Sequence, residues 1–248
     1  GINVHAQKQD NPVQLLPRLT VQYTDFSVWQ RKWLSGERLD NQLNYWTNKL
    51  QDVAVLELPT DYQRPSVQSF KGEQYDFMIS SSIQNKLNRL SSDNGSTLFM
   101  TLMSAFGVLL NKYTNQQDLC IGSPIANRNH KEIESLIGFF VNTLALRQEI
   151  NPAESFTQLL QQVKQTTLDA YEYQDVPFEK VVDNLNLERS MSHSPVFQVM
   201  FILQNTPSSM AEIDGLQIEE HKLETHTAKF DLTFTCTETA EGLMTNIE

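Results

Sequence analysis

Apolar residues recur along much of the chain at the spacing that is typical of amphipathic helices. This spacing first appears in residues 23–33 and continues in residues 39–50, so two helices are expected to open the domain. Farther along, Ile83, Leu87 and Leu90 recur at the same spacing. We expect this third helix to pack that apolar face inward.

Three further helices follow from the same kind of pattern. Residues 97–113 are apolar almost all round, which is typical of a helix buried between two layers. Residues 153–173 carry an apolar stripe that fits one long helix. A shorter helix is predicted from Pro177 to Leu185, because proline is well tolerated in the first helical turn.

Strands are predicted where apolar residues alternate with polar ones or form short apolar runs. These segments are residues 75–79, 118–125, 139–150, 196–203, 230–237 and 243–248. A Glu241-Gly242 turn predicts that the last two form a hairpin. Strands and helices in this order indicate an α/β fold, a layered mixed β-sheet with flanking helices. The polar residues 1–20 indicate a connector to this domain, which spans residues 21–248.

The amino-acid composition and charge of the chain exclude some classes of function. The chain has 40% hydrophobic residues and a formal net charge of −11, and its basic residues cluster only at Arg31 and Lys32. It therefore lacks the basic patch of a nucleic-acid-binding protein. The longest apolar stretch is too short to cross a bilayer, so we expect no membrane partner. Cys120 and Cys236 lie in apolar runs, which favours a reduced, cytoplasmic location.

No motif for metal or cofactor chemistry is present in the sequence. The five histidines form no metal-binding pattern, and the chain has no GxSxG, P-loop or GxGxxG segment. We therefore expect no metal site and no cofactor bound directly by this chain.

Asn142 is the most informative polar residue. Strand alternation places it on the same face as Phe140 and Leu144, where an unpaired amide is costly. Two interpretations are open: the amide bonds a neighbouring backbone group, or it lines a substrate channel. Arg147 and Asp175 allow the same two interpretations, with an ion pair the more common fate of such residues.

Four segments together resemble the late core motifs of the condensation domains of nonribosomal peptide synthetases, and they come in the same order. They are YTDFSVWQ (23–30, similar to YxDYAVWQ), IGFFVNTLALR (137–147, similar to IGxFVNTLxLR), YQDVPFEKVV (173–182, similar to HQDxPFExLV) and RSMSHSPVFQVMF (189–201, similar to RDxSRxPLFQxMF). The likeness extends from about Val21 to the end of the sequence.

Three departures qualify the resemblance. The family's HHxxxDG motif, which precedes the first of these segments and holds its catalytic histidine, does not occur here. Tyr173 stands where the family usually has histidine. The sequence also stops at Glu248, short of the family's closing segment and terminal helix. The chain is thus expected to be a C-terminal lobe that has no catalytic residue of its own and is inactive alone.

The resemblance implies a fold like chloramphenicol acetyltransferase, in which two lobes enclose a tunnel. Phosphopantetheine arms of two carrier proteins enter this tunnel, and the amine of one thioester attacks the other thioester to form an amide. Asn142, Phe140 and Leu144 are the residues that we expect to line it. The other motif residues are expected to hold the scaffold: Tyr23, Asp25, Trp29, Arg147, Asp175, Pro177, Phe178, Arg189 and Gln198.

The resemblance also implies partners. The expected ones are the N-terminal lobe of the same domain, upstream and downstream carrier proteins and a neighbouring adenylation domain. Residues 126–138 are expected to bridge the two lobes, and residues 204–221 to cross over to the first lobe. The face turned to that lobe should be apolar, so the isolated chain could self-associate through it.

Other functions remain open on the sequence alone. An epimerization, heterocyclization or ester-forming relative would share the fold but differ in the upstream motif. A non-catalytic domain that recruits a partner protein would have a degenerate motif and a blocked tunnel. A freestanding acyltransferase that uses a coenzyme A thioester would lack neighbouring carrier domains.

Overall fold

The computed structural model describes residues 19–187, 190–205 and 226–248 of the 248-residue chain. Its helices are α1 (Tyr23–Trp33), α2 (Glu37–Leu50), α3 (Ser81–Asp93), α4 (Leu98–Thr114), α5 (Phe156–Glu172) and α6 (Phe178–Leu185), with a 3₁₀ helix η2 (Lys131–Ile133). Its strands are β1 (Tyr75–Ser80), β2 (Asp118–Ile125), β3 (Asn142–Glu149), β4 (Val199–Gln204), β5 (Leu232–Glu238) and β6 (Gly242–Ile247). The predicted helices and strands of this region are confirmed, with shifts of a few residues at their ends.

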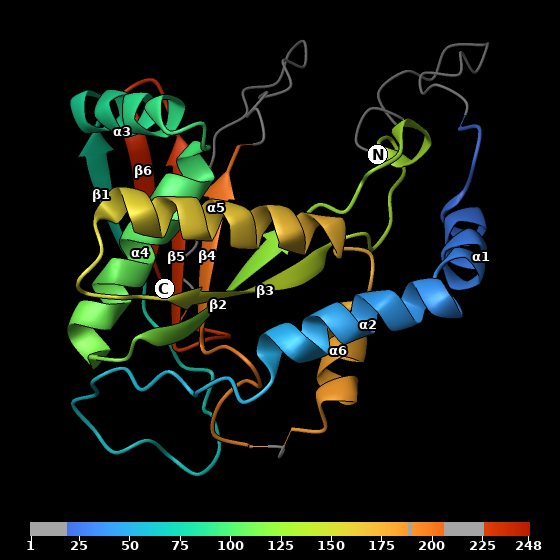
Figure 1. The fold of residues 1–248 in the computed structure, drawn as a ribbon, viewed down its shortest axis with the longest axis horizontal. Coiled ribbons are helices and arrows are strands. Elements are labelled where there is room, and N and C mark those ends of the chain that lie inside the picture. The colour runs from blue at the N-terminus through green and yellow to red at the C-terminus, as the bar shows by residue number, and fades with distance from the viewer. Residues whose placement is uncertain (1–18, 188–189, 206–225) are drawn as a thin grey trace, which may run out of the picture.

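The six strands form one mixed sheet in the order β1-β6-β5-β4-β2-β3 (Figure 1). Strand β4 runs parallel to both of its neighbours, β2 and β5, and the remaining pairs are antiparallel. Parallel neighbours bring the carboxyl ends of β2 and β4 to the same edge of the sheet. In many α/β sheets, ligands bind at such an edge.

The predicted hairpin joins β5 to β6, and Gly242 makes it possible. The backbone φ of Gly242 is +142°, and a Cβ at this position would lie 2.0 Å from the carbonyl oxygen of Ile79 on β1. Only glycine combines this dihedral with so close an approach of two chain segments. Strand β1 then pairs with β6 from Tyr75 opposite Ile247 to Ser80 opposite Gly242.

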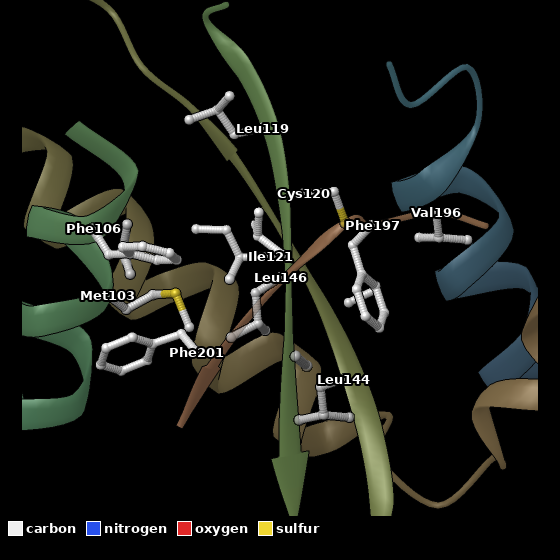
Figure 2. Packing of buried hydrophobic residues seen from close by; sticks show 14 of the residues in the cluster. Met103, Phe106, Leu119, Cys120, Ile121, Leu144, Leu146, Val196, Phe197 and Phe201 are labelled. Atoms are coloured by element: carbon white, nitrogen blue, oxygen red, sulfur yellow. The ribbon is translucent and has the colours of Figure 1, made fainter. Parts of the chain in front are cut away.

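Helices cover both faces of the sheet. Helices α3, α4 and α5 lie on one face, and α2 and α6 lie on the other face near β2 and β3 (Figure 1). Figure 2 shows Ile121 and Leu146 pointing toward Met103 and Phe106 of α4, whereas Phe197 lies on the opposite side of the strands. Strand alternation thus produces two apolar layers from one sheet.

The expected orientation of α3 is wrong in part. Ile83 is half exposed, while the polar residues Gln84 and Ser91 are buried. The Gln84 amide donates to the Glu238 carboxylate at the end of β5, and the Ser91 hydroxyl bonds Thr101 on α4 at 2.7 Å. These long-range polar contacts turn the helix so that Ile83 faces outward, which helical spacing alone does not show.

Candidate functional site

A pocket of about 180 Å³ opens where the carboxyl ends of β2 and β4 meet the start of β3. Strand β2 contributes Ser123, Pro124 and Ile125, and the end of β4 contributes Leu203 and Asn205. The other walls come from β3, from the first turn of α4 and from the last turn of α5. The residues that supply these walls are Leu144, Leu146, Phe99 and Tyr171.

The polar groups of this pocket are uncharged. Ser123 is 3% exposed, and within the described residues its hydroxyl has no hydrogen-bond partner. Tyr171 is 38% exposed, and burial raises the pKa of its phenol above the usual value of 10.0, so the ring stays neutral at pH 7. Asn205 adds an exposed amide at the rim. The pocket therefore offers hydrogen-bonding groups on an apolar wall without any formal charge.

Leu144 lines this pocket, whereas Asn142 is not among the lining residues. The Asn142 side chain is 8% exposed, and its amide nitrogen donates to the carbonyl oxygens of Gln174 and Val176, both at 2.9 Å. Its oxygen accepts the Phe178 N–H at 3.0 Å. Of the two interpretations of Asn142, the structure supports the one in which neighbouring backbone groups bind the amide.

Phe140, expected beside Leu144, lies in a different part of the molecule. Its ring is 3% exposed and belongs to a small cluster with Ile133 and Leu136. The rings of Tyr23 and Phe26 on α1 cover it, with centroids at 5.2 and 4.8 Å. Phe140 thus anchors the loop between β2 and β3 to α1 and does not line the pocket.

The same loop exposes an apolar ridge made of Ile137, Phe139 and Val141. These side chains are 96%, 78% and 54% exposed, although the buried Leu136 and Phe140 lie in the same segment. The Tyr23 hydroxyl donates to the Phe139 carbonyl oxygen at 3.0 Å and helps to hold this segment in place. An ordered segment that presents three apolar side chains to solvent is typical of a contact surface.

Arg147 and Gln198 have the scaffold contacts expected of them. Arg147 forms a two-pronged ion pair with Asp118, at 2.7 and 2.6 Å, and donates to the carbonyl oxygens of Lys49 and Gln51 at the end of α2. Gln198 is 2% exposed; its oxygen accepts the Leu56 N–H, and its nitrogen donates to the Ser194 carbonyl. Both side chains join segments that are far apart in sequence.

The remaining motif residues also lie outside the pocket. Asp25 accepts the Gln22 N–H at the start of α1, Trp29 stacks on Trp33 at 5.1 Å, Pro177 precedes α6, and the Phe178 ring packs on Phe197. Asp175 accepts a long hydrogen bond of 3.4 Å from Gln42, and burial raises the pKa of its carboxyl. Arg189 lies outside the described residues, as does most of the expected crossover at 204–221.

Tyr173, which replaces the histidine of the family motif, packs away from the pocket. Its ring stacks on Tyr45 with centroids 4.1 Å apart, and its carbonyl oxygen accepts the indole N–H of Trp46 at 2.8 Å. The residue therefore fastens the end of α5 to α2. Nothing in this arrangement requires the ring nitrogen of a histidine.

The sequence analysis missed Ser123, Tyr171 and Asn205 as polar residues of the site. Ser123 did carry a signal, because a hydroxyl in the apolar strand 118–125 is as unusual as the amide of Asn142. Within residues 19–187, 190–205 and 226–248, no group of three His, Cys, Asp or Glu could hold a metal ion. No helix in this part of the chain is long and apolar enough to span a membrane.

Comparison with known sequences gives a consistent family. The sequence profile described as Condensation domain matches residues 5–248. A linear gramicidin synthase of Brevibacillus parabrevis is 49% identical over 94% of this chain and 5% of that protein. Malpinin synthetase of Mortierella alpina is 46% identical over 94% of this chain and 3% of that protein. The chain thus spans a small part of the length of the curated relatives it matches.

Solved structures share the fold. The X-domain from teicoplanin biosynthesis has a TM-score of 0.85 at 24% identity, over 94% of this chain and 55% of that chain. A four-domain nonribosomal peptide synthetase bound to AMP and glycine has a TM-score of 0.77 at 25% identity, over 88% of this chain and 18% of that chain. These similarities confirm the expected fold class. The profile match and the sequence relatives together show that the chain belongs to the Condensation domain family.

Proposed function

We propose that this chain supplies one wall of the site in which a condensation domain forms an amide bond. In this reaction the amine of a carrier-tethered aminoacyl thioester attacks the carbonyl carbon of a carrier-tethered acyl or peptidyl thioester. The new C–N bond replaces the C–S bond, the amine loses a proton, and the thiol of the phosphopantetheine arm leaves protonated. The carriers bring phosphopantetheine as part of the substrates, so it is not a resident cofactor of this chain.

The pocket beside Leu144 is the observation that carries this proposal. It combines apolar walls with the uncharged hydroxyls of Ser123 and Tyr171, as suits a site that holds acyl and aminoacyl groups and keeps water away from a thioester. Within the described part of the chain, none of the residues that line it is a histidine or carboxylate able to accept the proton of the amine. Its contribution is therefore to position and shield the reactants.

The ridge of Ile137, Phe139 and Val141 supports the N-terminal lobe as the partner of this chain. The three exposed side chains lie in the loop that joins the ends of β2 and β3 that border the pocket. Covering this ridge with a second lobe buries apolar surface and also closes the pocket from that side. Carrier proteins and an adenylation domain are further proposed partners, because the relatives are large synthetases.

An amide-forming assay with two loaded carrier proteins tests the proposal. We expect no product from this chain alone and product when the N-terminal lobe is joined to it. Leu203→Trp, which fills the pocket, should lower the rate of the joined protein at least about tenfold. Ile202→Trp is the matched control, because Ile202 is the preceding residue of β4 and its side chain points to the opposite face of the sheet.

Four outcomes separate the candidate functions. Amide product that depends on the pocket supports the proposal. Binding of carriers by the joined protein without product favours the recruiting domain, and product formed from a coenzyme A thioester without carriers favours the freestanding acyltransferase. Inversion of a bound aminoacyl group, or formation of an ester or a heterocycle, favours the related domains of this fold.

A further inference from the structure

We infer that the pocket beside Leu144 selects substrates by charge and accepts only uncharged side chains from the group that enters it. This inference rests on the proposed function and goes beyond it by naming the class of amino acid that the site takes. Two observations support it: the chemical groups that line the pocket, and the contacts that direct the nearby charged side chains away from it.

Among the residues that the structure describes, none that lines the pocket carries a charge. Its polar groups are the hydroxyls of Ser123 and Tyr171 and the amide of Asn205, and the rest is aliphatic or aromatic. A carboxylate or an ammonium group that entered would lose its hydration without gaining a partner of opposite charge. A neutral side chain that can accept or donate a hydrogen bond could bond the Ser123 hydroxyl on the wall, which bonds no other described residue.

The charged residues nearest in sequence are directed elsewhere. Arg147 directly follows the lining residue Leu146, but strand alternation turns its side chain to the opposite face of the sheet, where it pairs with Asp118. In the last turns of α5, Asp169 and Glu172 border two other surface hollows and do not line this pocket. The absence of charge among the described lining residues is thus a local feature of an acidic chain.

The size of the pocket sets the scale of what it can hold. A volume of about 180 Å³ corresponds to roughly six water molecules at about 30 Å³ each. A side chain such as that of leucine, asparagine or glutamine can displace this water. A charged group loses more hydration free energy than a neutral one when this water is displaced, so filling the pocket increases the preference for neutral side chains.

Matched substrate pairs test the inference. The joined two-lobe protein is assayed with carriers loaded with Asn or Asp, Gln or Glu, and Leu or Lys, first as acceptors and then as donors. We expect kcat/KM for the charged member of each pair to be at least about 100-fold lower in the one position whose side chain enters the pocket. The other position should show a much smaller ratio.

The salt dependence of the rate distinguishes exclusion by the pocket from the long-range effect of the net charge of the chain. The net charge of −11 repels Asp and Glu but attracts Lys, and this long-range effect is screened beyond about 8 Å at physiological ionic strength. Exclusion by the pocket acts on Lys as well as on Asp and persists at high salt. A ratio that vanishes in about 0.5 M NaCl, or that disfavours only the acidic substrates, overturns the inference.

A reversal of specificity gives the sharper test. Ser123→Asp places a carboxylate on the wall, and we expect it to raise kcat/KM for Lys relative to Leu at least about tenfold. Ser123→Ala is the matched neutral control and should leave this ratio unchanged. Because a buried carboxylate can prevent folding, Tyr171→Glu is the second variant; Tyr171 is already 38% exposed, and a thermal melt checks each protein.

The outcomes distinguish the inference from the proposed function. If the joined protein makes no amide with any pair, the proposed function fails. If it makes amide equally well with charged and neutral pairs, the proposed function stands and the charge selection is overturned. An unchanged ratio of Lys to Leu in a folded Ser123→Asp or Tyr171→Glu protein also overturns it.

Discussion

The two ends of the β2–β3 pair use their polar residues in opposite ways. At one end, the Arg147 guanidinium donates hydrogen bonds to the Asp118 carboxylate and to two carbonyl oxygens at the end of α2. At the other end, Ser123 lies opposite Leu144 with its hydroxyl unbonded in the described residues. Charged residues at the first end hold the scaffold, whereas the pocket end keeps neutral groups available. In this protein, a strongly polar residue is therefore not by itself a sign of the site.

Asn142 is an exception to this contrast, because it lies at the pocket end of β3 but its amide is hydrogen-bonded within the scaffold. Asn142→Ala removes a local bond from the Thr143 N–H and three long-range bonds, to the carbonyl oxygens of Gln174 and Val176 and from the N–H of Phe178. At about 1 kcal/mol for each of the three long-range bonds, we expect the free energy of unfolding to fall by about 3 kcal/mol. Urea unfolding measures the change, with Asn205→Ala at the exposed rim as the near-neutral control. Equal stability of the two variants would contradict the scaffold role.

Removal of the charge at the far end has the next largest effect. Arg147→Met keeps much of the side-chain volume but leaves Asp118 unpaired and the last carbonyls of α2 without donors. We expect a loss of about 2 kcal/mol, less than for a fully buried pair because both side chains are partly exposed. Arg89→Met, which breaks an exposed ion pair with Asp93, is the control and should cost under about 0.5 kcal/mol. A similar loss of unfolding free energy for both variants would mean that the contacts of Arg147 do not stabilise the fold.

The stability of the protein at high pH depends on the Cys120 thiol; Cys120 lies opposite Arg147 in the antiparallel β2–β3 pair. Burial raises the pKa of its thiol from 9.0 to about 12, so the folded protein keeps the proton that the unfolded chain releases above pH 9. Stability is therefore full below pH 9 and falls as pH rises toward 12, by about 1 kcal/mol at pH 10. Denaturant titrations at pH 8 and 10 measure this loss, and Cys120→Ala should reduce it. The same pH slope in both proteins would exclude Cys120 as its source.

The smallest expected effect on stability belongs to the pocket itself. Ser123→Ala removes a hydroxyl that bonds none of the described residues, so the free energy of unfolding should change by less than about 0.5 kcal/mol. Ser91→Ala is the matched control, since the Ser91 hydroxyl bonds Thr101 and the Leu87 carbonyl and should cost at least about 1 kcal/mol. A large loss for Ser123→Ala would show that this hydroxyl belongs to the scaffold.

The sequence predicted the elements well because each depends on its own local pattern. The all-round apolar character of residues 97–113 identified α4 as the buried helix, and ten of its residues are buried in the structure. The turn before Gly242 predicted the β5–β6 hairpin correctly. The contacts of single polar side chains followed less directly from the sequence: Leu144 lines the pocket, whereas the Asn142 amide bonds backbone groups and Phe140 packs in a separate cluster. Their role in a substrate tunnel stays a prediction.

The sequence by itself determined the helices, the strands and the family, because periodicity and motif order are properties of neighbouring residues. Only the tertiary structure decided which polar groups are free. Three of the four partners of Asn142 lie 32 to 36 residues away, and those of Arg147 lie 29 residues away on β2 and 96 to 98 residues away at the end of α2. A hydrogen bond depends on distance in space, so only the folded arrangement of β2, β3 and β4 shows that the Ser123 hydroxyl bonds none of the described residues.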